Sequence, residues 1–182
     1  MRASVLMLPG WTNSGPDHWQ SVWEREHPEY TRVMQNCWDR PKRAEWIATI
    51  GRAIDASVEP VVLVAHSLGC LAAAGIAAGA DRARVERIGG AFLVAPADVD
   101  RPQSAAPLRA WRPVPLEPLP FPSMVVASQT DEYASFDRST QIANAWRSTL
   151  VDLGDAGHIN ASAGYGPWPA GHAMLLEFIG SL

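Results

Sequence analysis

Three residues have side chains that could together perform nucleophilic catalysis, and they occur along the chain in the order Ser67, Asp131, His158. A serine hydroxyl is a poor nucleophile near neutral pH, so it needs a base within hydrogen-bond reach. That base is in turn held and oriented by an acid. If the fold brings these three residues together, they predict attack by a serine oxygen and a covalent intermediate.

The segment around Ser67 suits an activated serine. Val61–Val64 predicts a strand buried on both faces, and the run Cys70–Ala80, rich in Ala and Gly, predicts a helix packed closely behind it. A serine in such a strand-to-helix turn is typical of the nucleophile elbow, written G-x-S-x-G. The flanking residues must be small because strand and helix nearly touch. Here they are Ala65, a departure from Gly, and Gly69.

Asp131 and His158 each follow a predicted strand. Asp131 comes directly after Met124–Ser128, and His158 follows Leu150–Leu153. Parallel strands end at one edge of a sheet, so both side chains should lie beside Ser67 in loops at that edge. The order serine, acid, histidine is also the order of the α/β-hydrolase fold. We therefore expect Ser67 to be the nucleophile, His158 the base and then the acid, and Asp131 the residue that orients the imidazole.

The chain offers alternatives for the acid and the base. Asp155 lies three residues before His158 and could orient that loop, whereas Asp137 falls at a helix start. His66 neighbours Ser67 but should point away from it across a tight turn. The remaining histidines fall in or near predicted helices: His18, His27 and His172. A strand-end loop would hold Asp131 at a fixed height relative to Ser67, which favours Asp131 over the other acids.

Backbone groups and indole rings should complete the site. The N–H of Leu68 and the N–H of Trp11, in the loop after the first strand, are expected to form an oxyanion hole. Gly10 would let that loop approach closely. Three tryptophans lie on predicted loops rather than helical stripes and are expected to wall a small apolar pocket: Trp11, Trp111 and Trp168.

Alternating strand and helix signals surround these residues. Six strands are predicted, at Ala3–Leu8, Tyr30–Gln35, Val61–Val64, Ile88–Val94, Met124–Ser128 and Leu150–Leu153. Helices are predicted after Asp17, after Pro41, and over Cys70–Ala80, Phe136–Leu150 and Ala170–Ile179. Seven prolines between residues 97 and 122 predict a long loop there. This alternation predicts one domain over residues 1–182, a three-layer α/β/α sandwich with a mostly parallel sheet of about six strands.

Composition narrows the classes of partner. The chain has 182 residues, which leaves little room for a lid, and its net charge of −4 does not favour nucleic acid. Cys37 and Cys70 lack metal-ligand spacing, so we expect no metal and two ordinary thiols in a reducing compartment. No segment suggests a signal peptide or a membrane span. We therefore expect a cytoplasmic protein that works without cofactor, metal, nucleic acid or membrane.

Several motifs spread over most of the chain match one known family. They are P-G-W at 9–11 with D-H-W at 17–19, A-H-S-L-G at 65–69, A-S at 127–128 through Asp131, G-H-I-N-A at 157–161, and G-P-W-P-A-G at 166–171. In these motifs the chain resembles the small serine hydrolases of the YdeN and retinoblastoma-binding-protein-9 type. The resemblance implies a minimal, lidless α/β-hydrolase that acts on small esters or amides with apolar groups. It also implies that Ser67, Asp131 and His158 form the triad.

The retinoblastoma-binding label does not transfer to this chain. An L-x-C-x-E motif beginning at Leu68 would need Glu at position 72, which is Ala72. The sequence therefore names no protein partner.

Two other functions use or preserve the same residues. An acyltransferase or thioesterase would use the same triad, and product analysis with and without an alcohol or thiol acceptor would distinguish it. A binding protein on a hydrolase scaffold would have lost turnover. The intact serine, acid and histidine in the expected order argue against that second alternative, so the sequence favours a serine hydrolase that forms an acyl-enzyme.

Overall fold

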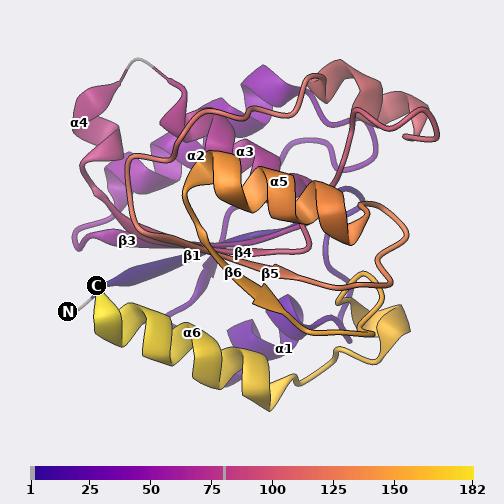
Figure 1. Cartoon of the computed structure of the whole chain (residues 1–182). Helices are drawn as coiled ribbons and strands as arrows, with labels where there is room; N and C mark the ends of the chain where they lie inside the picture. The colour runs from indigo at the N-terminus through magenta and orange to yellow at the C-terminus, as the bar shows by residue number, and fades with distance from the viewer. Residues whose placement is uncertain (1–2, 80) are drawn as a thin grey trace.

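A six-stranded parallel sheet forms the centre of the molecule (Figure 1). The computed structural model describes residues 3–79 and 81–182. The strands are β1 (Ser4–Leu8), β2 (Thr31–Arg32), β3 (Val61–His66), β4 (Ile88–Val94), β5 (Ser123–Ala127) and β6 (Thr149–Asp152). Their order across the sheet is β2-β1-β3-β4-β5-β6, and every neighbouring pair is parallel. The sheet confirms the predicted fold class.

Helices cover both faces of the sheet, as the layers of Figure 1 show. One face carries α2 (Arg43–Ala56), α3 (Leu68–Ala77) and α5 (Phe136–Trp146), and the other carries α1 (Trp19–Glu26) and α6 (Pro169–Ser181). A short helix, α4 (Arg82–Val85), and two 3₁₀ turns, η1 (Ala106–Trp111) and η2 (Ala161–Ala163), lie in the connections. Within the described residues, no helix has the length and apolar character needed to cross a bilayer.

The hydrophobic core lies on both sides of the sheet because its central strands are apolar on both faces. All six residues of β3 are buried, and α3 is buried from Leu68 to Ile76. A cluster under α2, α3 and α5 contains Trp46 and Trp111, whereas the cluster under α1 and α6 contains Trp19. Such two-sided burial explains why β3 is a continuous apolar run rather than an alternating one.

Some element boundaries differ from those predicted. The second strand shrinks from Tyr30–Gln35 to Thr31–Arg32, at the edge of the sheet where it has one neighbour. Helix α5 ends at Trp146 because Arg147 takes a left-handed conformation with φ of 58°. The proline-rich segment contains η1, since Pro107 fits the first turn of a helical segment. The predicted Cys70–Ala80 helix ends earlier, at Ala77, and its last position, 80, lies outside the described residues.

Candidate active site

Ser67 occupies a strained turn between β3 and α3. Its φ of 55° and ψ of −120° are sparsely populated by residues other than glycine. The turn is held from both sides: the Ser67 N–H donates to the Val94 carbonyl at 2.9 Å, and the Cys70 N–H donates to the Ser67 carbonyl at 3.0 Å. This is the geometry of a nucleophile elbow, which presents the serine oxygen beyond the carboxyl edge of the sheet.

Small residues around the turn let three backbone segments meet. A Cβ added to Gly69 would lie 2.2 Å from the carbonyl oxygen of Leu8, and one added to Gly10 would lie 2.9 Å from Cβ of Ser67. Ala65 is fully buried, so its methyl group is accommodated where the common pattern has glycine. The close approach of β1 to α3 therefore explains the requirement for glycine at position 69.

We expect Gly69→Ala to lower the free energy of unfolding by about 1–3 kcal/mol, the usual cost of overpacking. The new methyl group would overlap a backbone carbonyl, which cannot move aside as a side-chain end could. Gly180→Ala, in α6 with no atom within 4 Å of the added Cβ, is the matched control. Urea denaturation of both variants measures the effect, and equal stability of the two would contradict this account of the turn.

Ser67, His158 and Asp131 meet at one edge of the sheet. His158 Nε2 lies 2.9 Å from Ser67 Oγ, and His158 Nδ1 lies 2.9 Å from both carboxylate oxygens of Asp131. With neutral imidazole, the Nδ1–H donates to Asp131 and Nε2 accepts from the serine hydroxyl. The Asp131 side chain is only 2% exposed, so its charge is shielded from water next to the imidazole.

The loops that carry Asp131 and His158 are tied to each other. Thr130 Oγ1 donates to Asp155 Oδ1 at 2.7 Å and accepts from the Gly157 N–H at 3.1 Å. Asp131 Oδ1 also accepts from the N–H of Tyr133 at 2.8 Å. Asp155 therefore braces the loop through a threonine, whereas Asp131 contacts the imidazole directly.

His66 supports the backbone of His158. Its Nε2–H donates to the His158 carbonyl oxygen at 2.9 Å, so the side chain points away from the Ser67 hydroxyl. Burial, with smaller contributions from His158 and His18, lowers the pKa of His66 well below its usual value. His66 therefore stays neutral and adds no positive charge beside the candidate base. Its position next to Ser67 was the one sequence signal for this role.

His18 forms a second neutral imidazole next to His66, with ring centroids 4.7 Å apart. Burial, followed by the charge of Arg32 and then His158, lowers the pKa of His18 to about 3. Its Nδ1 accepts from the Gln20 N–H at 3.2 Å and so caps α1. His18 was predicted to lie near a helix, which is correct, but its position beside the site was not predicted.

The backbone N–H groups of Leu68 and Trp11 remain available near Ser67. Over residues 3–79 and 81–182, neither N–H donates a hydrogen bond to a protein acceptor. Leu68 is the first residue of α3, where N–H groups have no partner within the helix. Gly10 lies in the loop after β1 and allows this loop to approach the turn at Ser67. A Cβ atom added at position 10 would lie 3.4 Å from the Leu68 nitrogen.

A cavity of about 200 Å³ opens at Ser67 and His158. Its apolar wall includes Trp11, Leu108 and Tyr133, and the Tyr133 ring centroid lies 4.4 Å from that of His158. Leu108 and Tyr133 were missed by sequence analysis. The only signal for them was their position in loops that follow strands.

Two of the three tryptophans expected at the pocket lie elsewhere, so that prediction is corrected. Trp111 is fully buried, packs against Trp46 and donates its Nε1–H to the Pro41 carbonyl at 2.9 Å. Trp168 is also buried and stacks on Trp23, with centroids 5.7 Å apart. Neither ring lines the cavity, because each fills a gap between helices and sheet. Trp11 does line this cavity.

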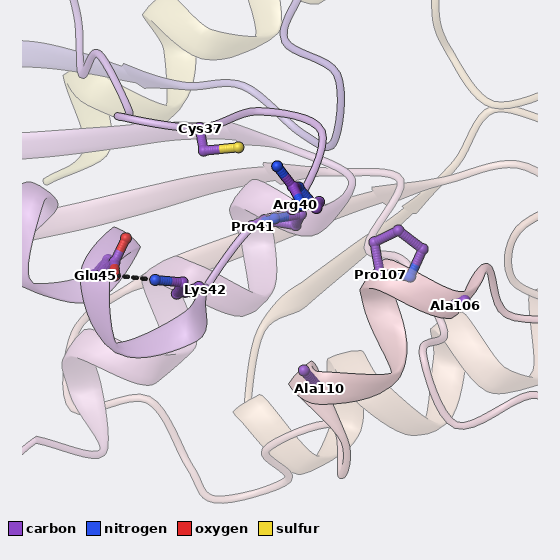
Figure 2. A pocket seen from close by; sticks show the side chains of 8 residues that line it. All are labelled: Cys37, Arg40, Pro41, Lys42, Glu45, Ala106, Pro107 and Ala110. Carbon is purple, nitrogen blue, oxygen red and sulfur yellow. Dashed lines mark hydrogen bonds and ion pairs between the residues drawn. The ribbon is translucent and has the colours of Figure 1, made fainter.

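Figure 2 shows a larger groove, whose volume is about 680 Å³. It separates the segment before α2 from η1, and it shares no lining residue with the cavity at Ser67. Its sides are formed by Cys37, Arg40, Pro41, Lys42, Glu45, Ala106, Pro107 and Ala110. Lys42 and Glu45 pair with each other at 2.8 Å. The groove therefore contains none of the candidate catalytic groups.

Comparisons with known proteins identify the family and support the fold. A family model described as serine hydrolase matches residues 5–177. A YdeN-like hydrolase from Pectobacterium atrosepticum is 37% identical with a TM-score of 0.85, and the match covers 97% of this chain and 90% of that protein. A search of curated protein sequences finds no significant match.

Two more distant structures support the fold alone. The ydeN gene product of B. subtilis is 19% identical with a TM-score of 0.73, and the match covers 98% of this chain and 100% of that one. Esterase 2 of Thermogutta terrifontis is 16% identical with a TM-score of 0.73, over 99% and 83% of the two chains.

Proposed function

The chain belongs to the serine hydrolase family, and we propose that it cleaves small esters or amides with apolar groups through an acyl-enzyme on Ser67. In this proposal His158 is the general base and then the general acid, and Asp131 fixes the imidazole tautomer. The observation that carries the proposal is the unbroken hydrogen-bonded series from Ser67 Oγ through His158 to Asp131, with each step at 2.9 Å. We also retain the predictions of a single domain over residues 1–182 and a cytoplasmic location.

Acylation follows from the groups around the serine oxygen. Ser67 Oγ attacks the substrate carbonyl carbon while its proton passes to His158 Nε2. The carbonyl oxygen becomes negatively charged, and the N–H groups of Leu68 and Trp11 stabilise it. The C–O or C–N bond then breaks, and the imidazolium returns its proton to the departing alcohol or amine.

Deacylation repeats the sequence with water as the nucleophile. His158 Nε2 takes a proton from the water, whose oxygen attacks the acyl carbon, and then returns the proton to Ser67 Oγ as the acid leaves. The imidazolium that forms in each half-reaction faces the Asp131 carboxylate. The neutral state of His18 and His66 also favours the imidazolium of His158, because a second cation beside His158 would oppose its protonation.

The size of the cavity predicts which esters are cleaved best. We expect kcat/KM for 4-nitrophenyl esters to stay flat or fall from butyrate to decanoate. Each additional CH₂ contributes about 0.8 kcal/mol to binding only if it leaves water, and a cavity of about 200 Å³ has no room for a long chain. Initial rates of nitrophenolate release test this, with the Ser67→Ala variant as the blank for reaction outside the site.

Trp11 should shape this profile. Trp11→Ala removes part of the cavity wall and should change the dependence on chain length, whereas Trp46→Ala removes a core indole that does not line the cavity. Trp46→Ala is therefore the control for general loss of packing. A steady rise in kcat/KM up to decanoate in the wild-type enzyme would show a long acyl groove and overturn the small-substrate proposal.

A further inference from the structure

A second, smaller cavity, which we call the second compartment, adjoins the cavity at Ser67. Its volume is about 80 Å³, and it shares four lining residues with the cavity at Ser67: Trp11, Ala97, Leu108 and Tyr133. These four residues contribute to the walls of both cavities, and we call them the apolar neck.

The second compartment is polar beyond the neck. Arg101, Gln103 and Ser104 line it, and we call these three residues the polar end. Ser104 is 5% exposed, and its Oγ has no hydrogen-bond partner within the described parts of the chain. Buried hydroxyl groups in native proteins are almost always hydrogen-bonded. This unpartnered hydroxyl in the wall of the second compartment is therefore a candidate hydrogen-bonding group for a polar part of a ligand.

Arg101 gives the polar end a positive charge. Its guanidinium donates to the Glu132 carbonyl and lies 5.8 Å from the centroid of the Tyr133 ring. Among the described residues no carboxylate forms an ion pair with Arg101, so several of its N–H groups are available.

The carboxylate of Asp98 also lines the second compartment, and its negative charge is offset by an arginine. Asp98 pairs with Arg138 at 3.3 Å, and the same guanidinium pairs with Asp100 at 2.7 Å. Both acids also accept backbone N–H groups in their own loop. Arg101 is therefore the lining charge that is left for a ligand.

We propose that the polar end binds a carboxylate at the far end of the acyl group, so that the preferred substrates are half-esters of short dicarboxylic acids. This inference rests on the proposed function, in which the acyl group enters the cavity at Ser67. A guanidinium matches a carboxylate through paired N–H groups, and the Ser104 hydroxyl and Gln103 amide supply further donors. The methylene groups between the two carbonyl carbons would lie in the apolar neck.

The test compares half-esters with uncharged esters of the same shape. The monomethyl esters of succinic, glutaric and adipic acid are each paired with an isosteric methyl ester, those of 4-methylpentanoic, 5-methylhexanoic and 6-methylheptanoic acid. In each pair an isopropyl end replaces the carboxylate. The selectivity, defined as kcat/KM for the half-ester divided by kcat/KM for its uncharged partner, is measured by chromatography of the released acid.

We expect the wild-type enzyme to favour one half-ester over its uncharged partner. Arg101→Met should lower that selectivity about tenfold, because it removes a partly exposed hydrogen bond to a charged group. Ser104→Ala should lower it by a smaller factor in the same direction. Arg52→Met, on the exposed face of α2, removes the same charge away from both cavities and should leave the selectivity unchanged. Because the selectivity is a ratio on one enzyme, differences in intrinsic activity between variants cancel.

The outcomes separate this inference from the proposed function. Suppose that uncharged esters are hydrolysed and that this hydrolysis needs Ser67. The carboxylate site alone is then overturned if the wild-type enzyme prefers no half-ester, or if its selectivity equals that of Arg101→Met. Absence of Ser67-dependent hydrolysis of every ester overturns the proposed function. In that case the binding of monomethyl glutarate, measured by calorimetry, tests the carboxylate site. The inference stands only if Arg101→Met binds this compound more weakly than Arg52→Met does.

Discussion

Ser67→Ala is expected to lower kcat for a 4-nitrophenyl ester by about 10⁴ or more while leaving the fold intact. The substitution removes the oxygen that lies 2.9 Å from His158 Nε2, and no other described serine lies in the cavity to replace it. Ser181→Ala, at the end of α6, is the matched control and should keep full activity. Circular dichroism and thermal unfolding check that both variants fold.

His158→Ala should cause a loss of similar size, because without the base the serine hydroxyl retains its proton near neutral pH. His27→Ala, outside the cavity, serves as its control. A fluorophosphonate probe provides a second readout: the adduct should map to Ser67 in the wild type and should form far more slowly in His158→Ala. An adduct at another residue, or full turnover in either active-site variant, would show that the triad is wrongly assigned.

Asp131→Asn is expected to lower kcat by about 10³–10⁴, the scale seen when a triad carboxylate is replaced by an amide in other serine hydrolases. The amide NH₂ can donate to His158 Nδ1, which favours the tautomer with the proton on Nε2, and that tautomer cannot accept the proton of Ser67. The effect should therefore appear mainly in kcat, with a smaller change in KM.

Asp155→Asn is the matched comparison for Asp131→Asn. It makes the same change from carboxylate to amide, in the loop that also carries His158. Its oxygen accepts from Thr130 Oγ1 at 2.7 Å, and an amide oxygen can still accept that bond. We expect a change in kcat of less than about threefold, because a retained neutral hydrogen bond alters local stability little. If Asp155→Asn were the more damaging substitution, the acid of the triad would have to be reassigned to Asp155.

Local sequence patterns determined the fold class and the edge of the sheet at which the candidate residues lie. The apolar run at Val61–Val64 specified a strand buried on both faces, and small residues at positions 65 and 69 allowed the turn that exposes Ser67. Because the strands are parallel, loops that follow them gather at one edge. Asp131 and His158 could therefore be placed near Ser67 from their position after strands alone.

Only the tertiary structure decided which loop side chains face the cavity. Trp111 and Trp168 were predicted at the pocket because they lie on loops, yet each indole is buried against residues far away in the sequence. Trp111 donates to the carbonyl of Pro41, and Trp168 packs on Trp23. A loop has no fixed periodicity, so its sequence does not encode which side faces inward.

The walls and supports of the site depend on the same kind of distant contact. Leu108 and Tyr133 come from separate loops and meet at the cavity, while His66 donates to the carbonyl of His158 across 92 positions of sequence. Strand and turn patterns reflect interactions between near neighbours in the chain, so they can be recognised in the sequence. The pairing of loops is set by the packing of the whole chain, which is why the structure was needed to identify the neck and the polar end beyond it.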